Sequence, residues 1–313
     1  MKQTKPLIPG LSRRTSIRYG VSCAIRFFKS GIGRSRRELK KRFGYSPFIH
    51  SYETLERYVG IINNFCDTVL TDAKAIRHIK SHHVETHFQN LLERNVTEKT
   101  IRVNASALIK LFLVFGRTDL VDYIDERRQS WVVEARPSGR TTPFTDPERV
   151  ISKMRRDELK AMAKIQLLTG ARVSDIKKVV AWVTENPDSY LVLIRKSKGG
   201  RDRVIDYADR RDTFEEIRQA CFSLKQFIDS TQKDWASLQI EYTEEVHLSA
   251  KKCEEIYCGT HAFRANYAER RYLELQGKSL LHGNDKEILK IITDELGHSR
   301  TKMAKYYISH FSA

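Results

Sequence analysis

Hydrophobic residues recur with helical spacing through the first half of the chain. Between residues 46 and 131 they return every three or four positions, which places them on one face of each helix. We therefore expect a small all-α domain over residues 46–135. The positions that define the pattern are Leu55, Tyr58, Val59, Ile62, Phe65, Ile76, Ile79, Val84, Phe88, Leu91, Leu108, Phe112 and Phe115.

The second half of the chain predicts helices that are interrupted by one β-hairpin. Residues 146–168 repeat apolar side chains with helical spacing, and helical patterns resume at Thr213 and continue to the end. Residues 189–196 are rich in β-forming side chains, and a second such run over 203–207 follows two glycines. The predicted fold class is mainly α with a small antiparallel β-sheet (α+β).

One segment between the two halves has the composition of a linker. Residues 136–143 contain two prolines, a glycine and several hydroxyl side chains. We predict a basic N-terminal arm over residues 1–45, a helical domain over 46–135, a linker over 136–144 and a second domain over 145–313.

Positive charge is concentrated at the start of the chain. The 313 residues include 56 Lys and Arg against 39 Asp and Glu, a net charge of +17, and residues 1–43 hold thirteen of the basic residues with one acid. Such clustering favours an arm that lies along nucleic-acid phosphates over a solvated tail or a membrane-binding segment. The arm side chains expected to bind are Arg34, Arg36, Arg37, Lys40, Lys41 and Arg42.

Other sequence features indicate the compartment. No apolar run reaches the ~18 residues of a membrane span, and the N-terminus lacks the apolar stretch of a secretory signal. Five cysteines are scattered without a C-x-x-C motif, which is typical of reduced thiols. We expect a soluble cytoplasmic protein. His83 and His87 lie one helical turn apart, but no carboxylate or cysteine completes a metal set at a recognised spacing, so we expect them to face solvent or nucleic acid.

Four polar clusters lie at the boundaries of predicted elements. The run T-G-A-R-V-S-D at 169–175 ends one helix and begins another, so Arg172 lies at a turn. The hairpin tip reads K-G-G-R-D-R at 198–203, and H-A-F-R at 261–264 puts a histidine and an arginine on one helical face. In the fourth cluster a helix ends at Gly297, His298 follows, and Tyr307 comes nine residues later. Each cluster alone is commonly structural, but chance does not readily account for all four.

With these four motifs the chain resembles the tyrosine recombinase (phage integrase) family, which shares its catalytic fold with type IB topoisomerases. The motifs cover residues 145–310, and residues 46–131 are similar to the family's helical core-binding domain in size and helical character only. Two spacings depart from the family pattern. The 33 residues between Arg264 and His298 suggest an inserted loop over 277–285, and only six residues follow Tyr307.

The resemblance implies a set of catalytic residues and a metal-free mechanism. Arg172 and Arg264 would hold a DNA phosphate, Tyr307 would attack it, and His261 would be the base. Lys198 would protonate the leaving oxygen, His298 would donate to a phosphate oxygen, and Asp175 would brace the site. Arg201 and Arg203 in the hairpin are expected to bind DNA. No carboxylate cluster for Mg²⁺ and no phosphate-binding glycine loop occurs, so we expect no cofactor.

The expected partner is double-stranded DNA with a specific recombination site. We expect a monomer in solution and a tetramer on paired sites, with an accessory DNA-bending protein as a further partner. The alternatives are a type IB-like topoisomerase, a hairpin-forming telomere resolvase, or a catalytically inactive DNA-binding protein of the same fold. A basic helical nucleoid-type binder would leave the four clusters unexplained.

Overall fold

The chain forms two compact units, Met1–Ser138 (unit 1) and Gly139–Ala313 (unit 2). The division lies within the predicted linker. The computed structural model describes residues 7–12, 14–34, 38–39, 41, 48–139, 141–197, 200–257, 259–278, 285–298 and 300–308. Each unit has its own hydrophobic core, so each is described by itself.

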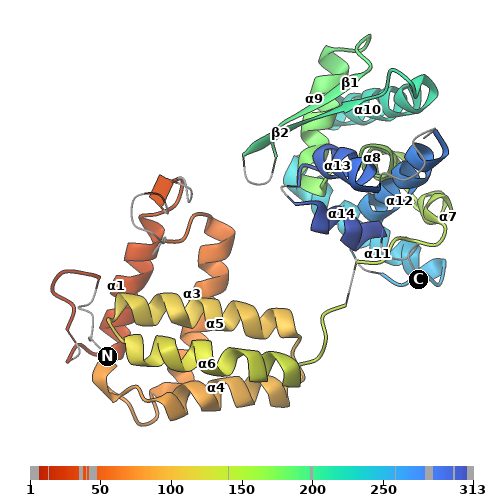
Figure 1. The fold of residues 1–313 in the computed structure, drawn as a ribbon. Helices are drawn as coiled ribbons and strands as arrows, with labels where there is room; N and C mark the ends of the chain where they lie inside the picture. Colours follow the sequence, from red (N-terminus) through yellow and green to blue (C-terminus); the bar gives the residue numbers. More distant parts are fainter. Residues whose placement is uncertain are drawn as a thin grey trace. The chain divides into compact units, whose positions relative to one another are not determined.

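Unit 1 is built from helices alone in its described part (Figure 1). Hydroxyl side chains cap three of them, because Ser16, Ser51 and Thr97 each accept a hydrogen bond from a backbone N–H of the first turn. The described residues of this half form helices and no strands, as predicted. The helices are α1 (Ile17–Lys29), α3 (Tyr52–Val69), η1 (Ile76–His78), α4 (Ser81–Glu93), α5 (Glu98–Val114) and α6 (Thr118–Glu134).

Aromatic side chains fill the centre of unit 1. The rings of Phe88 and Trp131 stack with centroids 4.0 Å apart, and Phe65 meets Phe112 edge to face. The Trp131 indole N–H donates to Glu85, which also accepts from Tyr123 and Arg127, so the polar end of the ring is satisfied. These contacts join α3, α4, α5 and α6 into one body.

The arm boundary predicted at residue 45 is wrong. Helix α1 lies inside the predicted arm, yet Ile17, Val21, Ala24 and Phe28 are buried in the core of unit 1 and the helix packs on α3 and α5. Every apolar residue of this set lies on one face, so the basic side chains of α1 occupy the other. The many basic residues of this segment favoured an extended arm in the prediction, although its apolar residues have the spacing of an amphipathic helix, α1.

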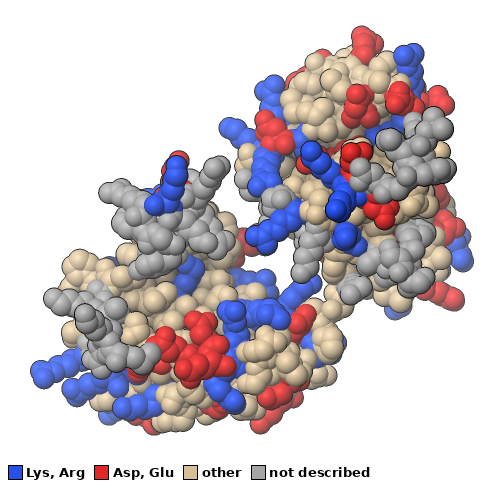
Figure 2. Space-filling view, in the orientation of Figure 1, with Lys and Arg blue, Asp and Glu red and all other residues tan. Residues whose placement is uncertain are grey.

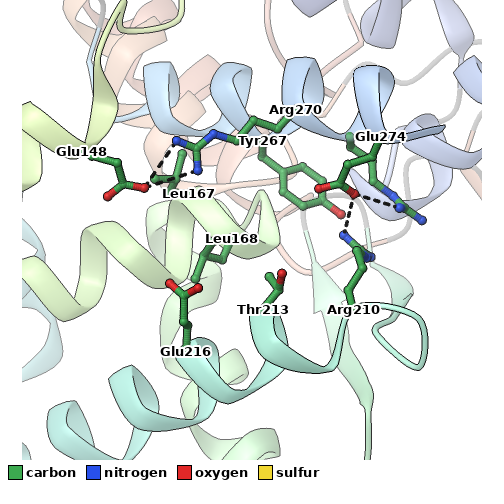
Figure 3. A pocket seen from close by; sticks show the side chains of 10 residues that line it. Glu148, Leu167, Leu168, Arg210, Thr213, Glu216, Tyr267, Arg270 and Glu274 are labelled. Carbon is green, nitrogen blue, oxygen red and sulfur yellow. Dashed lines mark hydrogen bonds and ion pairs between the residues drawn. The ribbon is translucent and has the colours of Figure 1, made fainter. Parts of the chain in front are cut away.

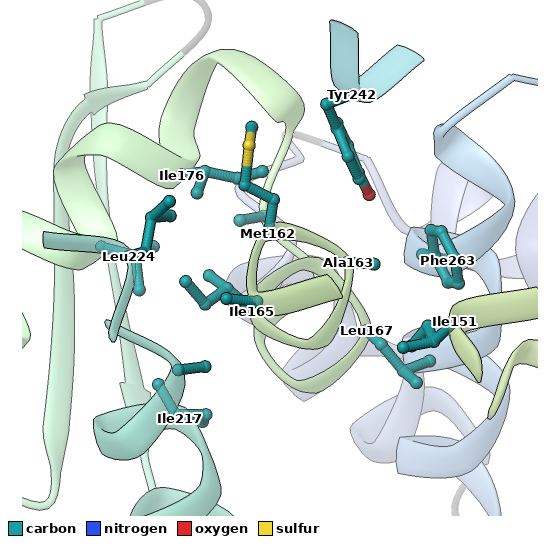
Figure 4. Close-up of a cluster of buried hydrophobic side chains, with 14 of the residues drawn as sticks. Ile151, Met162, Ala163, Ile165, Leu167, Ile176, Ile217, Leu224, Tyr242 and Phe263 are labelled. Atoms are coloured by element: carbon teal, nitrogen blue, oxygen red, sulfur yellow. The ribbon is translucent and has the colours of Figure 1, made fainter. Parts of the chain in front are cut away.

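Unit 2 contains the remaining helices and the only strands among the described residues. Helix α8 is central, since it packs against α7, α9, α10, α11 and α12. Its side chains are buried around its circumference, as those of Met162, Ala163, Ile165 and Leu167 show (Figure 4). The helices are α7 (Pro147–Ser152), α8 (Asp157–Thr169), η2 (Val173–Asp175), α9 (Ile176–Glu185), α10 (Arg211–Thr231), α11 (Trp235–Lys252), α12 (His261–Lys278), α13 (Asp285–Glu295) and α14 (Thr301–Ile308).

The predicted hairpin is present with slightly shifted bounds. Strands β1 (Leu191–Ser197) and β2 (Arg201–Asp206) pair antiparallel, and Val192 lies opposite Ile205. The register shifts between Ile194 and Ser197, where Lys196 has a φ of +46°. This bulge turns Ser197 toward the interior, where it is buried. The predicted fold class, mainly α with a small antiparallel sheet, is confirmed.

Two further expectations concern loops and membranes. Of the expected inserted loop over 277–285, the two ends are helical, since α12 runs to Lys278 and α13 begins at Asp285. Residues 279–284 lie outside the described part of the chain. Within the described residues, no helix is both long and apolar enough to cross a membrane.

We predict that trypsin separates the two units at Arg140. The backbone of Arg136 is bonded to Val96 and Glu98, which protects it, and Arg140 is the next basic residue along the linker. Limited digestion followed by intact-mass analysis should yield a stable fragment that begins at Thr141. Arg140→Gln should remove this cut. Survival of a product that spans residues 136–144, while either unit is degraded, would contradict the prediction.

Candidate active site

The site begins where α8 ends. Gly170 caps the helix with a left-handed backbone, φ +59°, and a Cβ there would lie 2.5 Å from the Tyr267 ring and 2.9 Å from Leu296. Only glycine fits both the conformation and the space. The carbonyl of Gly170 is thereby turned toward two arginine side chains.

Arg264 is the buried centre of the site. Its side chain is fully buried on α12, and it donates to the carbonyls of Gly170 and Leu296 and, over 3.1 Å, to Nε2 of His298. Burial, together with the nearby guanidiniums of Arg203 and Arg172, lowers the pKa of Arg264 to about 9. A pKa of that value still leaves the guanidinium charged at neutral pH.

Tyr307 lies against this arginine. Tyr307 opposes the lowering of the Arg264 pKa, and its ring centroid lies 6.0 Å from that of His298. The phenol is buried on α14. The last turn of α13 sets this arrangement, because Gly297 with φ +65° reverses the chain and the His298 N–H donates to Thr293.

Hydrogen bonding fixes the proton on His298. A guanidinium can only donate, so Nε2 accepts from Arg264 and the ring proton lies on Nδ1. The pKa of His298 is lowered to about 3, mainly by burial. Electrostatic interactions with Arg264, Arg172, Arg203 and His261 lower it further. The ring is therefore neutral at physiological pH, with Nδ1–H as its donor.

Arg172 lies at the more open side of the site. Its side chain is 13% exposed, and its NH1 donates to Ser197 Oγ over 2.8 Å and lies 3.7 Å from Asp175. Ser197 in turn donates to Asp175 over 2.7 Å. The predicted brace by Asp175 thus reaches Arg172 mainly through Ser197, a residue that the sequence analysis did not single out. No local signal marks it, because the alternation that buries Val192 and Ile194 would turn Ser197 outward, and only the bulge turns it inward.

Asp175 is the carboxylate on which several cations converge. It is 2% exposed and pairs with Lys178 over 3.1 Å and Arg203 over 3.3 Å. Burial alone would raise the pKa of Asp175, but Ser197, Lys178 and Arg203 outweigh it and lower the pKa. The carboxylate is therefore ionised in the folded chain.

His261 is brought to the same site. It is the first residue of α12 and is exposed, whereas Arg264 one turn later is fully buried. His261 is also among the groups that lower the pKa of His298. Five of the six predicted catalytic residues are thus gathered in unit 2; Lys198 lies outside the described residues.

Some of the predicted DNA-binding residues are exposed and one is buried. Arg201 is exposed at the start of β2, but Arg203 is 3% exposed and pairs with Asp175, so the expectation that Arg203 binds DNA from the surface is wrong. Residues two apart on a strand share a face, so Arg203 lies on the inward face of β2 with buried Ile205. Arg201 lies at the exposed start of the strand, opposite Ser197, where the register shifts. In the arm, Arg34 and Lys41 are exposed. The other predicted arm contacts, Arg36, Arg37, Lys40 and Arg42, lie outside the described residues.

The expected exposure of His83 and His87 is also wrong. Both are buried, and His87 bonds to Asn104 while His83 bonds to Asp72 over 2.8 Å. Asp72, His82 and His83 bring potential metal ligands together. However, Nδ1 of His83 accepts the Lys80 N–H, so Nε2 must carry the ring proton and cannot also present a lone pair to a metal. This triad is a helix-start contact and not a metal site.

A cavity of about 180 Å³ in unit 2 is lined by residues of α7, α8, α10 and α12 (Figure 3). Its arginines are already ion-paired, Arg270 with Glu148 and both Arg210 and Arg271 with Glu274. Their charges are compensated, so the cavity offers no excess charge to a ligand.

Comparison with solved structures places the fold among integrases. The chain aligns with a lambda integrase dimer bound to a COC′ core site with a TM-score of 0.62 and 13% identity, over 94% of this chain and 77% of that chain. It has the integrase fold. A second alignment, to the Tn1549 transposon integrase in complex with a circular intermediate DNA, has a TM-score of 0.55 and 14% identity over 91% of this chain and 94% of that one. No protein-family model and no curated protein sequence matches the chain. The resemblance seen in the motifs is confirmed at the level of the integrase fold.

We predict that acid destabilises the chain through His298. The ordinary pKa of an unfolded histidine is about 6.5, whereas that of His298 is lowered to about 3. Below pH 6.5 the unfolded chain therefore binds a proton that the folded chain does not. This contribution is complete above pH 6.5 and is lost as the pH falls toward 3, at no more than about 1.4 kcal/mol per pH unit.

Urea unfolding at several pH values between 8 and 5 measures the effect. His298→Gln keeps an acceptor for Arg264 but cannot titrate, so its free energy of unfolding should fall less over this range than that of the wild type. Parallel curves for the two proteins would show that His298 titrates normally in the folded chain.

Proposed function

We propose that this chain is a tyrosine-type, site-specific DNA recombinase that cleaves and rejoins DNA through a 3′-phosphotyrosyl intermediate. The observation that carries the proposal is that His298 bonds to Arg264 and lies beside the ring of Tyr307, with the charge of Arg172 nearby. A phenol, two guanidiniums and a neutral imidazole together supply a nucleophile and fixed cations for a phosphate. The integrase fold supports the same conclusion.

The arginines are suited to bind the phosphate that reacts. Attack on a phosphodiester builds negative charge on its non-bridging oxygens, and a planar guanidinium can bind two of them at once. Arg172 uses NH1 to bind Ser197 and keeps partial exposure, so its remaining N–H groups can face the phosphate. Arg264 would bind from the buried side. The Nδ1–H of His298 would donate to a phosphate oxygen.

The proposed reaction is a balanced exchange of two phosphodiesters. The Tyr307 oxygen bonds to phosphorus as the bond to the 5′-oxygen breaks, His261 accepts the phenol proton, and Lys198 gives a proton to the leaving 5′-oxygen. Attack by a 5′-hydroxyl of another strand then reverses these steps and releases the tyrosine. No energy source is needed, because the phosphotyrosyl bond conserves the energy of the bond that was cleaved.

Double-stranded DNA is the proposed partner, bound by both units. Figure 2 shows Lys and Arg side chains gathered along the edge of unit 2 where β1 and β2 lie. Exposed Arg195, Lys196 and Arg201 belong to this hairpin. On unit 1, α1 presents Arg18, Arg26 and Lys29 to solvent. We further propose that the protein is monomeric in solution, that it assembles as a tetramer on paired DNA sites with an accessory DNA-bending protein, and that it acts in the cytoplasm.

We predict that Tyr307, and not Tyr306, becomes bonded to DNA. Adjacent side chains on a helix point about 100° apart, and the Tyr306 hydroxyl instead accepts the Thr141 N–H over 3.1 Å. The probe is a pool of nicked duplexes of randomised sequence, whose cleaved end is lost so that the covalent complex accumulates. Tyr307→Phe should abolish capture. Tyr306→Phe, the matched control, should retain it at a cost in stability of about 1 kcal/mol.

Peptide mapping identifies the tyrosine that carries the adduct. An adduct on Tyr306, or capture that EDTA abolishes, would refute the assignment. Duplexes selected in this way should also be joined to one another by the wild type. Relaxation of supercoils without such joined products would favour the topoisomerase alternative, and joining of a duplex end to itself would favour the telomere resolvase.

We predict that the basic residues that follow α1 bind DNA phosphates directly and do not act only through the net charge of the chain. Arm variants with Arg36, Arg37, Lys40 and Arg42 changed to Gln should flatten the slope of log affinity against log salt by roughly 0.9 for each phosphate that the arm no longer neutralises. Changing Arg18, Arg26 and Lys29 on α1 removes a similar charge from a fixed helix face and is the matched comparison. Equal slopes for the arm variant and the wild type would mean that the arm makes no phosphate contacts.

A further inference from the structure

Arg203 is a third guanidinium in the site, and it is bound on several sides. Its side chain is fully buried on β2. NH1 donates to the carbonyls of Glu295 over 3.2 Å and Gly170 over 3.4 Å, and NH2 pairs with Asp175 over 3.3 Å. One side chain thus contacts the end of α8, the end of α13 and the carboxylate that follows Arg172.

These contacts are shared with the groups proposed to act on the phosphate. Gly170 O accepts from both Arg203 and Arg264. Glu295 O and Leu296 O are consecutive carbonyls of the chain, and Arg203 binds the first while Arg264 binds the second. The two guanidiniums therefore hold the same two helix ends from opposite segments, β2 and α12.

Arg203 also packs against the turn that carries His298. A Cβ on Gly297 would lie only 3.1 Å from Cδ of Arg203, so the arginine stem and this glycine fit each other. The buried Nε of Arg203 meets no acceptor among the described residues. Burial, partly offset by Asp175, lowers the pKa of Arg203 to about 10. A buried charge with an unsatisfied N–H costs stability, so stability alone does not account for an arginine here.

We propose that Arg203 is a positioning residue that fixes Arg264 and His298 relative to Arg172. The proposal rests on the strand-transfer function proposed above. By tying β2 to Gly170, Glu295 and Asp175, Arg203 sets the spacing between the turn that bears Arg172 and the turn that bears His298. In this role Arg203 acts through Arg264 and His298 and not on the phosphate itself.

The planar fork of arginine is essential to this role. Two carbonyls and a carboxylate are bound by NH1 and NH2 in one plane, a geometry that the single ammonium of lysine cannot reproduce. A lysine would keep the positive charge beside Asp175 but lose the fixed spacing. Charge and geometry can therefore be separated by substitution.

The experiment compares Arg203→Lys and Arg203→Met with Ile205→Ala, all on β2. Ile205 is fully buried in the hydrophobic core and has no part in the polar contacts, so its variant controls for loss of stability. Each protein is assayed while fully folded, on a duplex selected by the wild type from the randomised pool. Duplex affinity and the single-turnover rate of covalent capture are measured separately.

We expect both Arg203 variants to bind the duplex within about threefold of the wild type but to capture it roughly 10–100-fold more slowly, as happens when orienting groups are removed. Ile205→Ala should capture at nearly the wild-type rate. A full rate for Arg203→Lys would show that charge alone matters and would overturn the positioning role. So would equal rates for Arg203→Met and the Ile205 control. If Arg203→Met does not fold, the lysine variant decides.

A spectroscopic readout addresses the geometry directly. Nitrogen-isotope labelling of histidine reports the tautomer, and wild-type His298 should carry its proton on Nδ1 because Nε2 accepts from Arg264. In both Arg203 variants this preference should weaken, whereas Ile205→Ala should preserve it. An unchanged tautomer in both variants would contradict the proposal. Absence of capture by the wild type would instead refute the proposed function and leave this spectroscopic result to stand by itself.

Discussion

Two buried arginines bind one backbone carbonyl, and the rest of the site depends on that contact. Arg264 and Arg203 both donate to Gly170 O at the end of α8. At the end of α13, Arg264 donates to Leu296 O and Arg203 donates to Glu295 O. Burying a guanidinium costs several kcal/mol. Helix ends offset that cost, since their last carbonyls lack partners within the helix and carry partial negative charge. The arginines therefore bind carbonyls that have no partner within the helices, and these carbonyls stabilise the buried positive charges.

The same contact leaves the site with an excess of positive charge. Arg203 and Arg172 help to lower the pKa of Arg264, Arg172 also acts to lower that of Arg203, and Asp175 is the carboxylate among them. The nearby carboxylate of Glu295 is already bound by Arg271 and Tyr267. An anion that entered would relieve this repulsion. Because the donors are fixed before it arrives, little reorganisation is needed when charge develops.

Unit 1 has an uncharged core and carries positive charge on its surface. Its core is aromatic and apolar, and α1 buries Ile17, Val21, Ala24 and Phe28 while its exposed face is basic. Part of the positive charge at the start of the chain is therefore held on a rigid surface. Rigid placement matters for a proposed DNA contact, since it avoids the entropic cost of ordering a flexible segment on binding.

Local sequence is enough to predict which helices and strands form and most of the residues that make up the site. Helical spacing, the hairpin, the linker composition and the turn at Gly297 follow from local rules, and local rules hold wherever a side chain's environment is set by its near neighbours. The four motifs named Arg172, His261, Arg264, His298 and Tyr307, and the described structure brings these residues together.

Long-range packing determines which of those side chains become buried. Arg203 in the hairpin was expected to bind DNA, but the pairing of β2 with β1 places it on the inward face with Ile205, where it meets Asp175. Likewise, α1 became part of a core because α3 and α5 cover its apolar face, and Ser197 became the bridge to Arg172. These outcomes depend on residues far apart in the chain, whose meeting is fixed by packing and not by spacing along the sequence.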